Sequence, residues 1–199
     1  MNRVVITGMG IWSCIGTSLE EVRDALYQGK SGIIFSQERK DAGFRSALVG
    51  NVPKVDLKPY VPRNLRNFMP EEAQYGYIAT KQALDHAGID EDYLNTHEVG
   101  IIYGNDSVAE ATMQSLDKFR QANSAVACGS GAIFQSMNSN ITMNLACLFK
   151  LRGINLTASA ACASGSQSIG LAALLISQGL QDCVVCGGAE ENNMYGIAS

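Results

Sequence analysis

The sequence predicts a layered α/β domain, in which a mainly parallel sheet is covered by helices on both faces. Short β-branched runs alternate along the chain with longer segments of helical periodicity, an order that is typical of parallel sheets. Hydrophobic residues make up 46% of the 199 residues and charged residues only 17%. A charged share below the usual value of about 25% favours a globular chain with a large core, and it excludes disorder, collagen and coiled coil.

The first third of the chain predicts one strand, one helix and a long loop. Val4–Thr7 is a short β-branched run that we expect to form a buried strand. Ser18-Leu19-Glu20-Glu21 has the pattern of a capping box, so a helix should begin there and run to about Gln28, with Gly29 at its C-terminal end. The polar stretch Lys30–Asn67 contains three of the four prolines, and we expect it to be a loop.

The middle of the chain predicts a helix, a strand and a second helix. Glu71–His86 carries apolar residues near one helical face, and Gly88 should stop this helix. Val99–Tyr103 is expected to be the next strand, and Val108–Arg120 a further helix.

The last third continues the alternation of helices and strands. It predicts a helix at Met137–Lys150, a strand at Ile154–Ala158, a helix at Ile169–Gln178 and a strand at Cys183–Cys186. Ile169–Gln178 is apolar nearly all round, so this helix should be buried.

Charge and cysteine usage limit the partners and the compartment. Fifteen basic and 19 acidic residues give a net charge of −4, so the basic excess typical of nucleic-acid-binding proteins is missing. No run reaches the roughly 18 apolar residues that a membrane span needs, and no signal-peptide cleavage pattern follows the N-terminal apolar run. The six cysteines lie mostly among apolar residues. We therefore expect a reduced, cytoplasmic protein that binds neither nucleic acid nor membrane.

A glycine motif near the N-terminus invites a dinucleotide-binding interpretation. Gly8-Met9-Gly10-Ile11-Trp12-Ser13 follows the first predicted strand, but Ser13 stands where the third glycine should be. No strand-terminal acidic residue follows about 20 residues later. We interpret this motif as a tight structural turn.

The cysteine pair and the two histidines are weak candidates for chemistry. Cys183 and Cys186 have the spacing of a metal or redox motif, but they lie in an apolar strand, where residues three apart point to opposite faces. We expect a core strand there and no metal site. His86 falls in the last turn of a helix and His97 in a polar loop, and both are better explained as structural or solvated residues.

The segment around Cys162 has the features of a nucleophilic turn. A predicted strand ends near Ala158, small residues follow on both sides of Cys162, and a long helix begins just after it. This is the arrangement of a nucleophile elbow, with cysteine in place of serine. The free N–H groups and the dipole at a helix N-terminus favour thiolate over thiol and can stabilise an oxyanion. On spacing alone, one more buried thiol is an equally good interpretation.

The segment Ser159–Gly170 resembles the active-site segment of the β-ketoacyl-(acyl-carrier-protein) synthases. Three other segments resemble this family in order and approximate spacing: Val4–Gly10, Leu151–Asn155 and Gly187–Glu191. The stretch Arg66–Met69 and the pair Glu190-Glu191 are more similar to the bacterial type I and type II condensing enzymes than to the thiolases.

The resemblance implies a thiolase-like fold, a mixed and mostly parallel sheet covered by helices, with residues 1–199 as its N-terminal half. It implies that Cys162 accepts an acyl group from a carrier-protein thioester for decarboxylative Claisen condensation with malonyl-carrier protein, in fatty acid or polyketide synthesis. The backbone N–H of Cys162 would be one oxyanion donor. The resemblance implies no metal or redox cofactor, because the phosphopantetheine arm belongs to the carrier protein.

The implied partners are an acyl carrier protein and a second subunit. Carrier proteins of this family are acidic, and Arg63 and Arg66 match the family's basic docking stretch best. Ordinary solvated charge on a loop remains an alternative for these two residues. The family usually dimerises, so a homodimer or a ketosynthase-type heterodimer is expected.

Two features depart from the family pattern. The family's nucleophile works with two histidines and a lysine from the second half of the chain, and no such segments occur here. We therefore expect a C-terminal half outside this chain, and we expect the chain alone to be inactive in condensation. The second departure is Asp106 in Gly104-Asn105-Asp106-Ser107, where the family usually has a glycine-rich turn. Asp106 indicates either a shorter or more polar acyl chain, or an Asx-type turn.

Two alternative functions stay open. One is a thiolase-type acyltransferase that acts on coenzyme A esters with a further cysteine from the distal half. The other is a non-catalytic, chain-length-factor-like partner subunit. Such subunits typically lose the nucleophile, so the intact motif around Cys162 argues against the second alternative.

Overall fold

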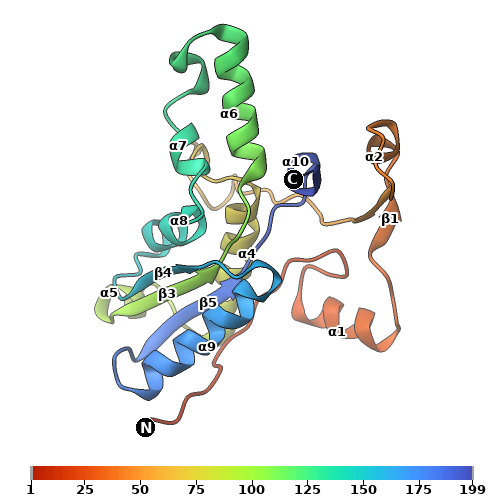
Figure 1. The fold of residues 1–199 in the computed structure, drawn as a ribbon. Coiled ribbons are helices and arrows are strands. Elements are labelled where there is room, and N and C mark those ends of the chain that lie inside the picture. Colours follow the sequence, from red (N-terminus) through yellow and green to blue (C-terminus); the bar gives the residue numbers. More distant parts are fainter. Residues whose placement is uncertain (1, 199) are drawn as a thin grey trace.

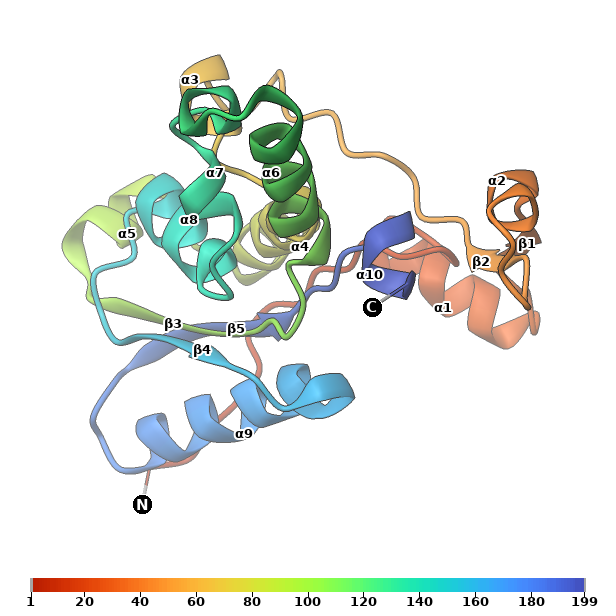
Figure 2. The same cartoon turned by 45° about the horizontal axis from the view of Figure 1, so that its top comes forward.

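The computed structural model describes residues 2–198 and shows a parallel sheet between two layers of helices (Figures 1 and 2). Among these residues the sheet has three strands in the order β4, β3, β5, which span Asn155–Ala158, Val99–Gly104 and Cys183–Gly188. β3 pairs in parallel with both neighbours, and all six of its residues are buried. The predicted layered α/β architecture is confirmed.

Helices cover both faces of this sheet. α9, Ser164–Ser177, lies on one face, whereas α4, Glu71–Ala87, and α8, Asn140–Phe149, lie on the other (Figure 2). The main core lies on the side of α4 and α8, where Tyr77 stacks on Phe149 with 4.9 Å between ring centroids. Both helices therefore bury their apolar faces against β3, as the helical periodicity predicts.

The capping signals place α1, Leu19–Tyr27, as predicted. The Ser18 hydroxyl accepts a hydrogen bond from the Glu21 N–H at 3.2 Å, and Gly29 follows the helix with φ of +63°. The Glu21 carboxylate accepts from the N–H and the hydroxyl of Thr17, and these bonds lower its pKa. The start of α1 is thus fixed by side chains within four residues of it.

The buried strand predicted at Val4–Thr7 is wrong. In the described part of the chain, residues 3–12 run extended beside α4 and pair with no strand. The N–H of Met9 donates to His86 Nδ1 at 3.2 Å, and the N–H of Ile11 donates to Gln82 Oε1 at 2.9 Å. Side chains of α4 therefore take the backbone donors that a neighbouring strand would otherwise accept.

Gly8 and Gly10 allow this segment to approach the backbone of α4. A Cβ at Gly8 would lie 2.1 Å from the carbonyl oxygen of Ala83, and one at Gly10 would lie 1.9 Å from that of Ala79. The tight turn predicted for this motif is therefore wrong. The two glycines serve close packing of an extended segment on a helix.

The loop predicted at Lys30–Asn67 contains short elements. β1, Ile33–Phe35, and β2, Leu48–Gly50, form an antiparallel pair, and α2, Gln37–Asp41, lies between them in the sequence. α3, Arg63–Arg66, lies near the end of the stretch. Strands of three residues carry too little alternation to be recognised in the sequence.

The remaining helices lie outside the main layers or connect them. α5, Glu91–Thr96, precedes β3, and α10, Met194–Ala198, follows β5. α6, Ala109–Ala122, extends away from the sheet, and the 3-10 helix η1, Ala125–Cys128, and α7, Ala132–Gln135, lead back towards α8 (Figure 1).

Burial of the helix at Ile169–Gln178 is a further wrong prediction. Ile169 and Leu174 on α9 are 47% and 53% exposed. Large apolar side chains are exposed elsewhere too, on residues 3–12, the β1–β2 pair and the α6–α7 excursion: Val5, Ile6, Met9, Ile33, Ile34, Phe35, Leu48, Met113, Leu116, Phe119, Val126, Ile133 and Phe134. Apolar surface of this extent typically marks contact with another chain or segment.

Within residues 2–198 no helix is long and apolar enough to cross a membrane.

The packing of residues 3–12 on α4 can be tested at Gly10. Gly10→Ala should lower the free energy of unfolding by about 1–3 kcal/mol, because the new methyl group overlaps the backbone of α4. Gly170→Ala is the matched control, since a Cβ there meets nothing within 4 Å. It should stabilise the helix by up to about 1 kcal/mol. Urea unfolding followed by circular dichroism measures both, and an unchanged midpoint for Gly10→Ala would contradict the packing role.

Candidate active site

Cys162 lies at the turn that joins β4 to α9, at the carboxyl edge of the sheet. The 3-10 helix η2, Ala161–Ala163, carries it, and α9 begins at the next residue, Ser164. The Cys162 residue is exposed. The predicted strand-to-helix turn with a cysteine before a long helix is therefore present.

The turn is strained just before the cysteine. Ala161 has a φ of +47°, in the left-handed region that costs a non-glycine residue about 1–2 kcal/mol. The Ser164 hydroxyl supports this geometry, because it accepts from the Ala160 N–H at 2.8 Å and donates to the Ala161 carbonyl at 2.7 Å. The Ala163 N–H also donates to the Ala160 carbonyl, at 3.0 Å. A sharp, strained turn of this kind is what a nucleophile elbow requires.

Glycines seat the start of α9 directly on the sheet. A Cβ at Gly104 would lie 2.4 Å from the carbonyl carbon of Ser164, and a Cβ at Gly188 would lie 2.9 Å from the Cα of Gly165. The Ser168 hydroxyl, on a residue with no exposed surface, donates to the Gly187 carbonyl at 2.6 Å. The position of the cysteine turn relative to β3 and β5 is therefore fixed by backbone contact.

Glu191, just beyond β5, organises the neighbouring loops. Its carboxylate accepts from the Ser107 hydroxyl at 2.5 Å, the Asn193 amide at 2.8 Å, and the N–H groups of Ala109 and Glu110 at 2.6 and 3.1 Å. Burial alone would raise its pKa, but these hydrogen bonds outweigh burial and hold the pKa below its usual range. Glu191 thus caps the N-terminus of α6. The sequence carries no local signal for this role, because the acid lies 82 residues from the helix start.

Glu72 on α4 is a second buried acid near this edge. It is 1% exposed, and its Oε1 accepts from the side-chain amide of Asn140 on α8 at 2.7 Å. Burial raises its pKa to about 7 against the effect of that hydrogen bond, and the charges of Glu191 and Glu190 act in the same direction as burial. A proton on Glu72 is therefore held more tightly in the folded chain than in the unfolded one.

The basic residues predicted to dock a carrier protein lie on a different element. Arg63 is exposed and Arg66 is half-buried, both on α3. α3 adjoins α7, since the Gln135 side chain donates to the Asn67 carbonyl at 2.8 Å. Figure 2 shows this pair of helices on the opposite side of the sheet from α9.

The histidines and the cysteine pair have structural surroundings. His86 binds the Met9 N–H, and His97 is the C-terminal cap of α5, where its ring stacks on Tyr93 at 4.0 Å. Cys183 and Cys186 are half-buried on β5, and burial raises the pKa of both thiols. Residues 2–198 contain no group of three or more His, Cys, Asp or Glu side chains that could hold a metal ion.

A cysteine at a strained turn on the edge of a parallel sheet defines a layered α/β protein of the nucleophile-elbow type. The family model described as "Beta-ketoacyl synthase, N-terminal domain" matches residues 1–197. The chain therefore belongs to the β-ketoacyl synthase family.

Individual relatives agree with this assignment. The chain is 39% identical over 193 residues to 3-oxoacyl-(acyl-carrier-protein) synthase 1 of Escherichia coli. These residues are 96% of this chain and 47% of that protein. A β-ketoacyl synthase structure from Burkholderia phymatum superposes with a TM-score of 0.89 at 29% identity, over 100% of this chain and 49% of that one. The ishigamide ketosynthase/chain length factor superposes with a TM-score of 0.82 at 28% identity, over 94% of this chain and 47% of that one. The predicted thiolase-like fold is confirmed, and the chain spans about half the length of these relatives.

The raised pKa of the buried acid Glu72 predicts how the free energy of unfolding depends on pH. Because its folded pKa lies above the ordinary value, its contribution to the free energy of unfolding is lost as pH rises from about 4.5 to about 7. Glu72→Gln keeps an oxygen for Asn140 and has no proton to lose. The variant should therefore gain stability relative to the parent chain as pH rises, by at most about 3 kcal/mol at pH 8.

Urea midpoints at pH 5 and pH 8 measure this gain. The exposed acid Glu20 offers the control variant Glu20→Gln, which removes a carboxylate from the surface of α1. A Glu72→Gln difference that is the same at both pH values would show that Glu72 does not titrate in this range.

Proposed function

We propose that this chain supplies the acyl-accepting half of a β-ketoacyl-(acyl-carrier-protein) synthase, an acyltransferase of fatty acid or polyketide synthesis. The observation that carries the proposal is the exposed Cys162 on a strained turn before the 14-residue helix α9. The names of the relatives support the same reaction, since the relative from Escherichia coli is a 3-oxoacyl-(acyl-carrier-protein) synthase.

The proposed step is a thioester exchange. The Cys162 thiolate attacks the acyl carbonyl carbon of a carrier-protein thioester, and the new C–S bond forms as the bond to the carrier sulfur breaks. The departing thiolate then takes a proton from solvent. The negative charge that develops on the carbonyl oxygen is stabilised by the backbone N–H of Cys162 and by the dipole of α9. The chain needs no cofactor of its own for this step, because the phosphopantetheine arm is part of the carrier protein.

Condensation needs groups that this chain does not bring to Cys162. Decarboxylation of a malonyl thioester requires a donor to the developing enolate oxygen. His86 and His97 bind the Met9 segment and α5 instead. We therefore propose that a C-terminal half of family length supplies the donors.

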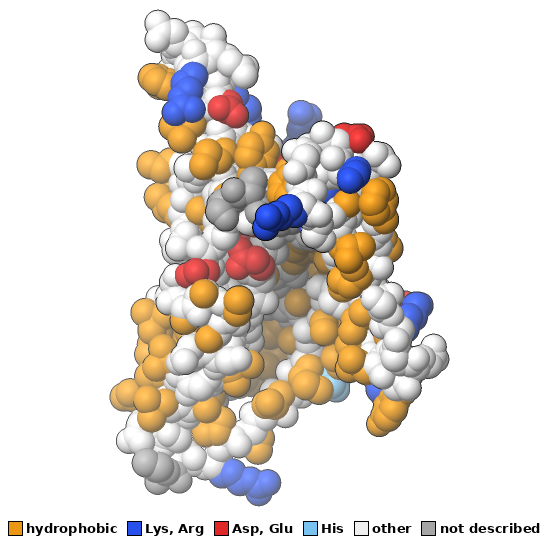
Figure 3. Space-filling model, turned by 45° about the vertical axis from the view of Figure 1, so that its right-hand side comes forward, with side chains coloured by type: hydrophobic (Ala, Val, Ile, Leu, Met, Phe, Trp, Pro, Cys, Tyr) orange, Lys and Arg blue, Asp and Glu red, His pale blue; other side chains and the backbone are white. Residues whose placement is uncertain are grey.

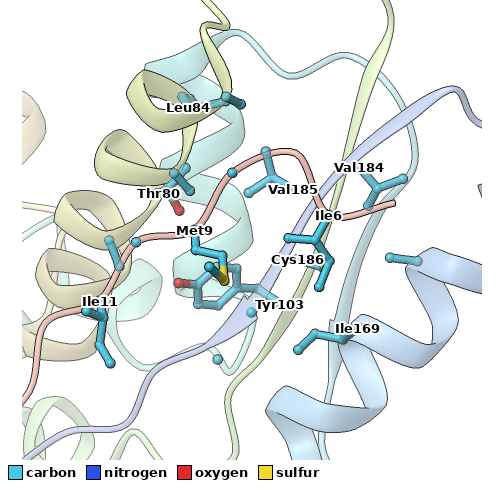
Figure 4. Close-up of a pocket in the computed structure, with 18 of the residues that line it drawn as sticks. Ile6, Met9, Ile11, Thr80, Leu84, Tyr103, Ile169, Val184, Val185 and Cys186 are labelled. Carbon is cyan, nitrogen blue, oxygen red and sulfur yellow. The ribbon is translucent and has the colours of Figure 1, made fainter. Parts of the chain in front are cut away.

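The proposal of a C-terminal half is supported by a groove that lies between residues 4–12, α4, α9 and β5. Its volume is about 650 Å³, and Figure 4 shows Ile6, Met9, Ile169 and Cys186 around it. Figure 3 shows hydrophobic side chains along a hollowed face of the molecule. We propose that the C-terminal half covers the groove, because apolar side chains such as Ile6, 75% exposed, gain most from burial.

The proposed partners are an acyl carrier protein and a second subunit. Arg63 on α3 is free to meet an acidic carrier protein, and Arg66 extends the same basic surface. The exposed apolar side chains of α6 and α7 suit a subunit interface, in a homodimer or a ketosynthase-type heterodimer. A cytoplasmic location suits these partners.

A chain-length-factor-like subunit is the second candidate function. The similarity to the ishigamide ketosynthase/chain length factor favours it. The presence of Cys162 in its complete turn favours the acyl-accepting role over it. A thiolase-type acyltransferase acting on coenzyme A esters would need a further cysteine from the distal half.

Electrophile labelling tests the role of Cys162. Cerulenin, which mimics a fatty acyl chain, should modify Cys162 before the other five cysteines, as shown by peptide mapping. Cys147 on α8 is the internal control, since it is also exposed. Equal labelling of Cys147 and Cys162 would contradict an activated nucleophile.

The need for a second half has its own test. The purified 199-residue chain should release no carbon dioxide from malonyl-carrier protein above the level of a blank without the chain. Detection of ¹⁴CO₂ from labelled substrate provides the measurement. Release above that blank by this chain alone would contradict the requirement for donors from a second half.

A further inference from the structure

Asp106 contacts the segment that leads to the nucleophile. It follows β3, and its carboxylate accepts a hydrogen bond from the hydroxyl of Ser159. Ser159 comes directly after β4 and three residues before Cys162. The carboxylate therefore links two loops at the sheet edge, 53 residues apart, in addition to any role within its own turn.

The residues on either side of Asp106 are held by hydrogen bonds. The Asn105 N–H donates to the Ala158 carbonyl at 3.1 Å, and the Asn105 side chain donates to the Asn138 carbonyl at 2.9 Å. On the other side, the Ser107 hydroxyl donates to Glu191. Asn105 is 1% exposed and Glu191 is 7% exposed. Asp106 is thus an exposed hydrogen-bond acceptor whose two neighbours in the chain are held in place by hydrogen bonds.

Three sets of contacts hold the cysteine turn, and each acts on a different part. The glycine contacts hold α9 against the sheet, and the Ser164 hydroxyl holds the inside of the turn at Ala160 and Ala161. Neither set reaches the side chain of Ser159, where the chain leaves β4. The bond to Asp106 restrains that part and so limits the directions that the strained turn can take.

We propose that Asp106 is a positioning residue for Cys162, acting through Ser159, and that Glu191 keeps Asp106 in reach through Ser107. The proposal rests on the proposed function of Cys162 as acyl acceptor. It gives Asp106 a role in orienting the thiol towards the N–H groups of α9, whatever the acyl chain.

The test is the alkylation of Cys162 by iodoacetamide, measured by peptide mass spectrometry between pH 6 and pH 9, with Cys147 as internal reference. Asp106→Ala and Ser159→Ala should each lower the ratio of the two rates about two- to fivefold, the range expected for an exposed bond to a charged acceptor. The double variant should fall no further than either single variant, because both remove the same bond.

The conservative variant separates position from charge. The amide oxygen of Asp106→Asn can still accept from Ser159, so this variant should recover most of the ratio without its carboxylate. Glu191→Gln should lower the ratio partially, since one amide oxygen cannot serve four donors. Asp117→Ala, an exposed site on α6, is the control and should leave the ratio unchanged.

Three results would overturn the proposal: an unchanged ratio in Asp106→Ala, additive losses in the double variant, or an Asp106→Asn variant as slow as Asp106→Ala with a displaced pH profile. The last would indicate an effect of charge. A parent chain whose Cys162 reacts no faster than Cys147 would instead contradict the proposed function, and that result is independent of the ratios between variants.

Discussion

The N-terminus of α9 lies against β3 and β5 at a distance that only glycine permits. A methyl group at Gly104 would overlap the backbone of Ser164, and one at Gly188 would overlap Gly165. This contact decides where the helix dipole begins relative to the sheet, and therefore where Cys162 stands. The strain at Ala161 can persist only because the helix behind it and the strand before it are both held in place.

The polar residues of the same edge depend on the parallel order of the strands. Because β3, β4 and β5 run in parallel, their carboxyl ends meet, and the loops after them converge. Asp106 follows β3, Ser159 follows β4 and Glu191 follows β5. The hydrogen bonds among these loops connect the cap of α6 to the cysteine turn. Glu191 binds Ser107 in the loop after β3, and Asp106 of that loop binds Ser159 after β4.

Two wrong sequence predictions have one physical cause. Val4–Thr7 and Ile169–Gln178 are apolar enough to be buried, yet Ile6 and Ile169 are 75% and 47% exposed in this chain. Apolar composition indicates that a segment prefers burial, but it does not say which segment will cover it. The relatives are about twice as long as this chain.

The sequence by itself determined the features that depend on near neighbours. Ser18 and Glu21 predict the start of α1, and the small residues around Cys162 predict the turn before α9, since caps and turns involve contacts within a few residues. Only the tertiary structure decided the partners of Asp106 and Glu191, which lie 53 and 82 residues away in the chain. Such contacts arise when the strands assemble and bring their ends together, and no local pattern encodes them.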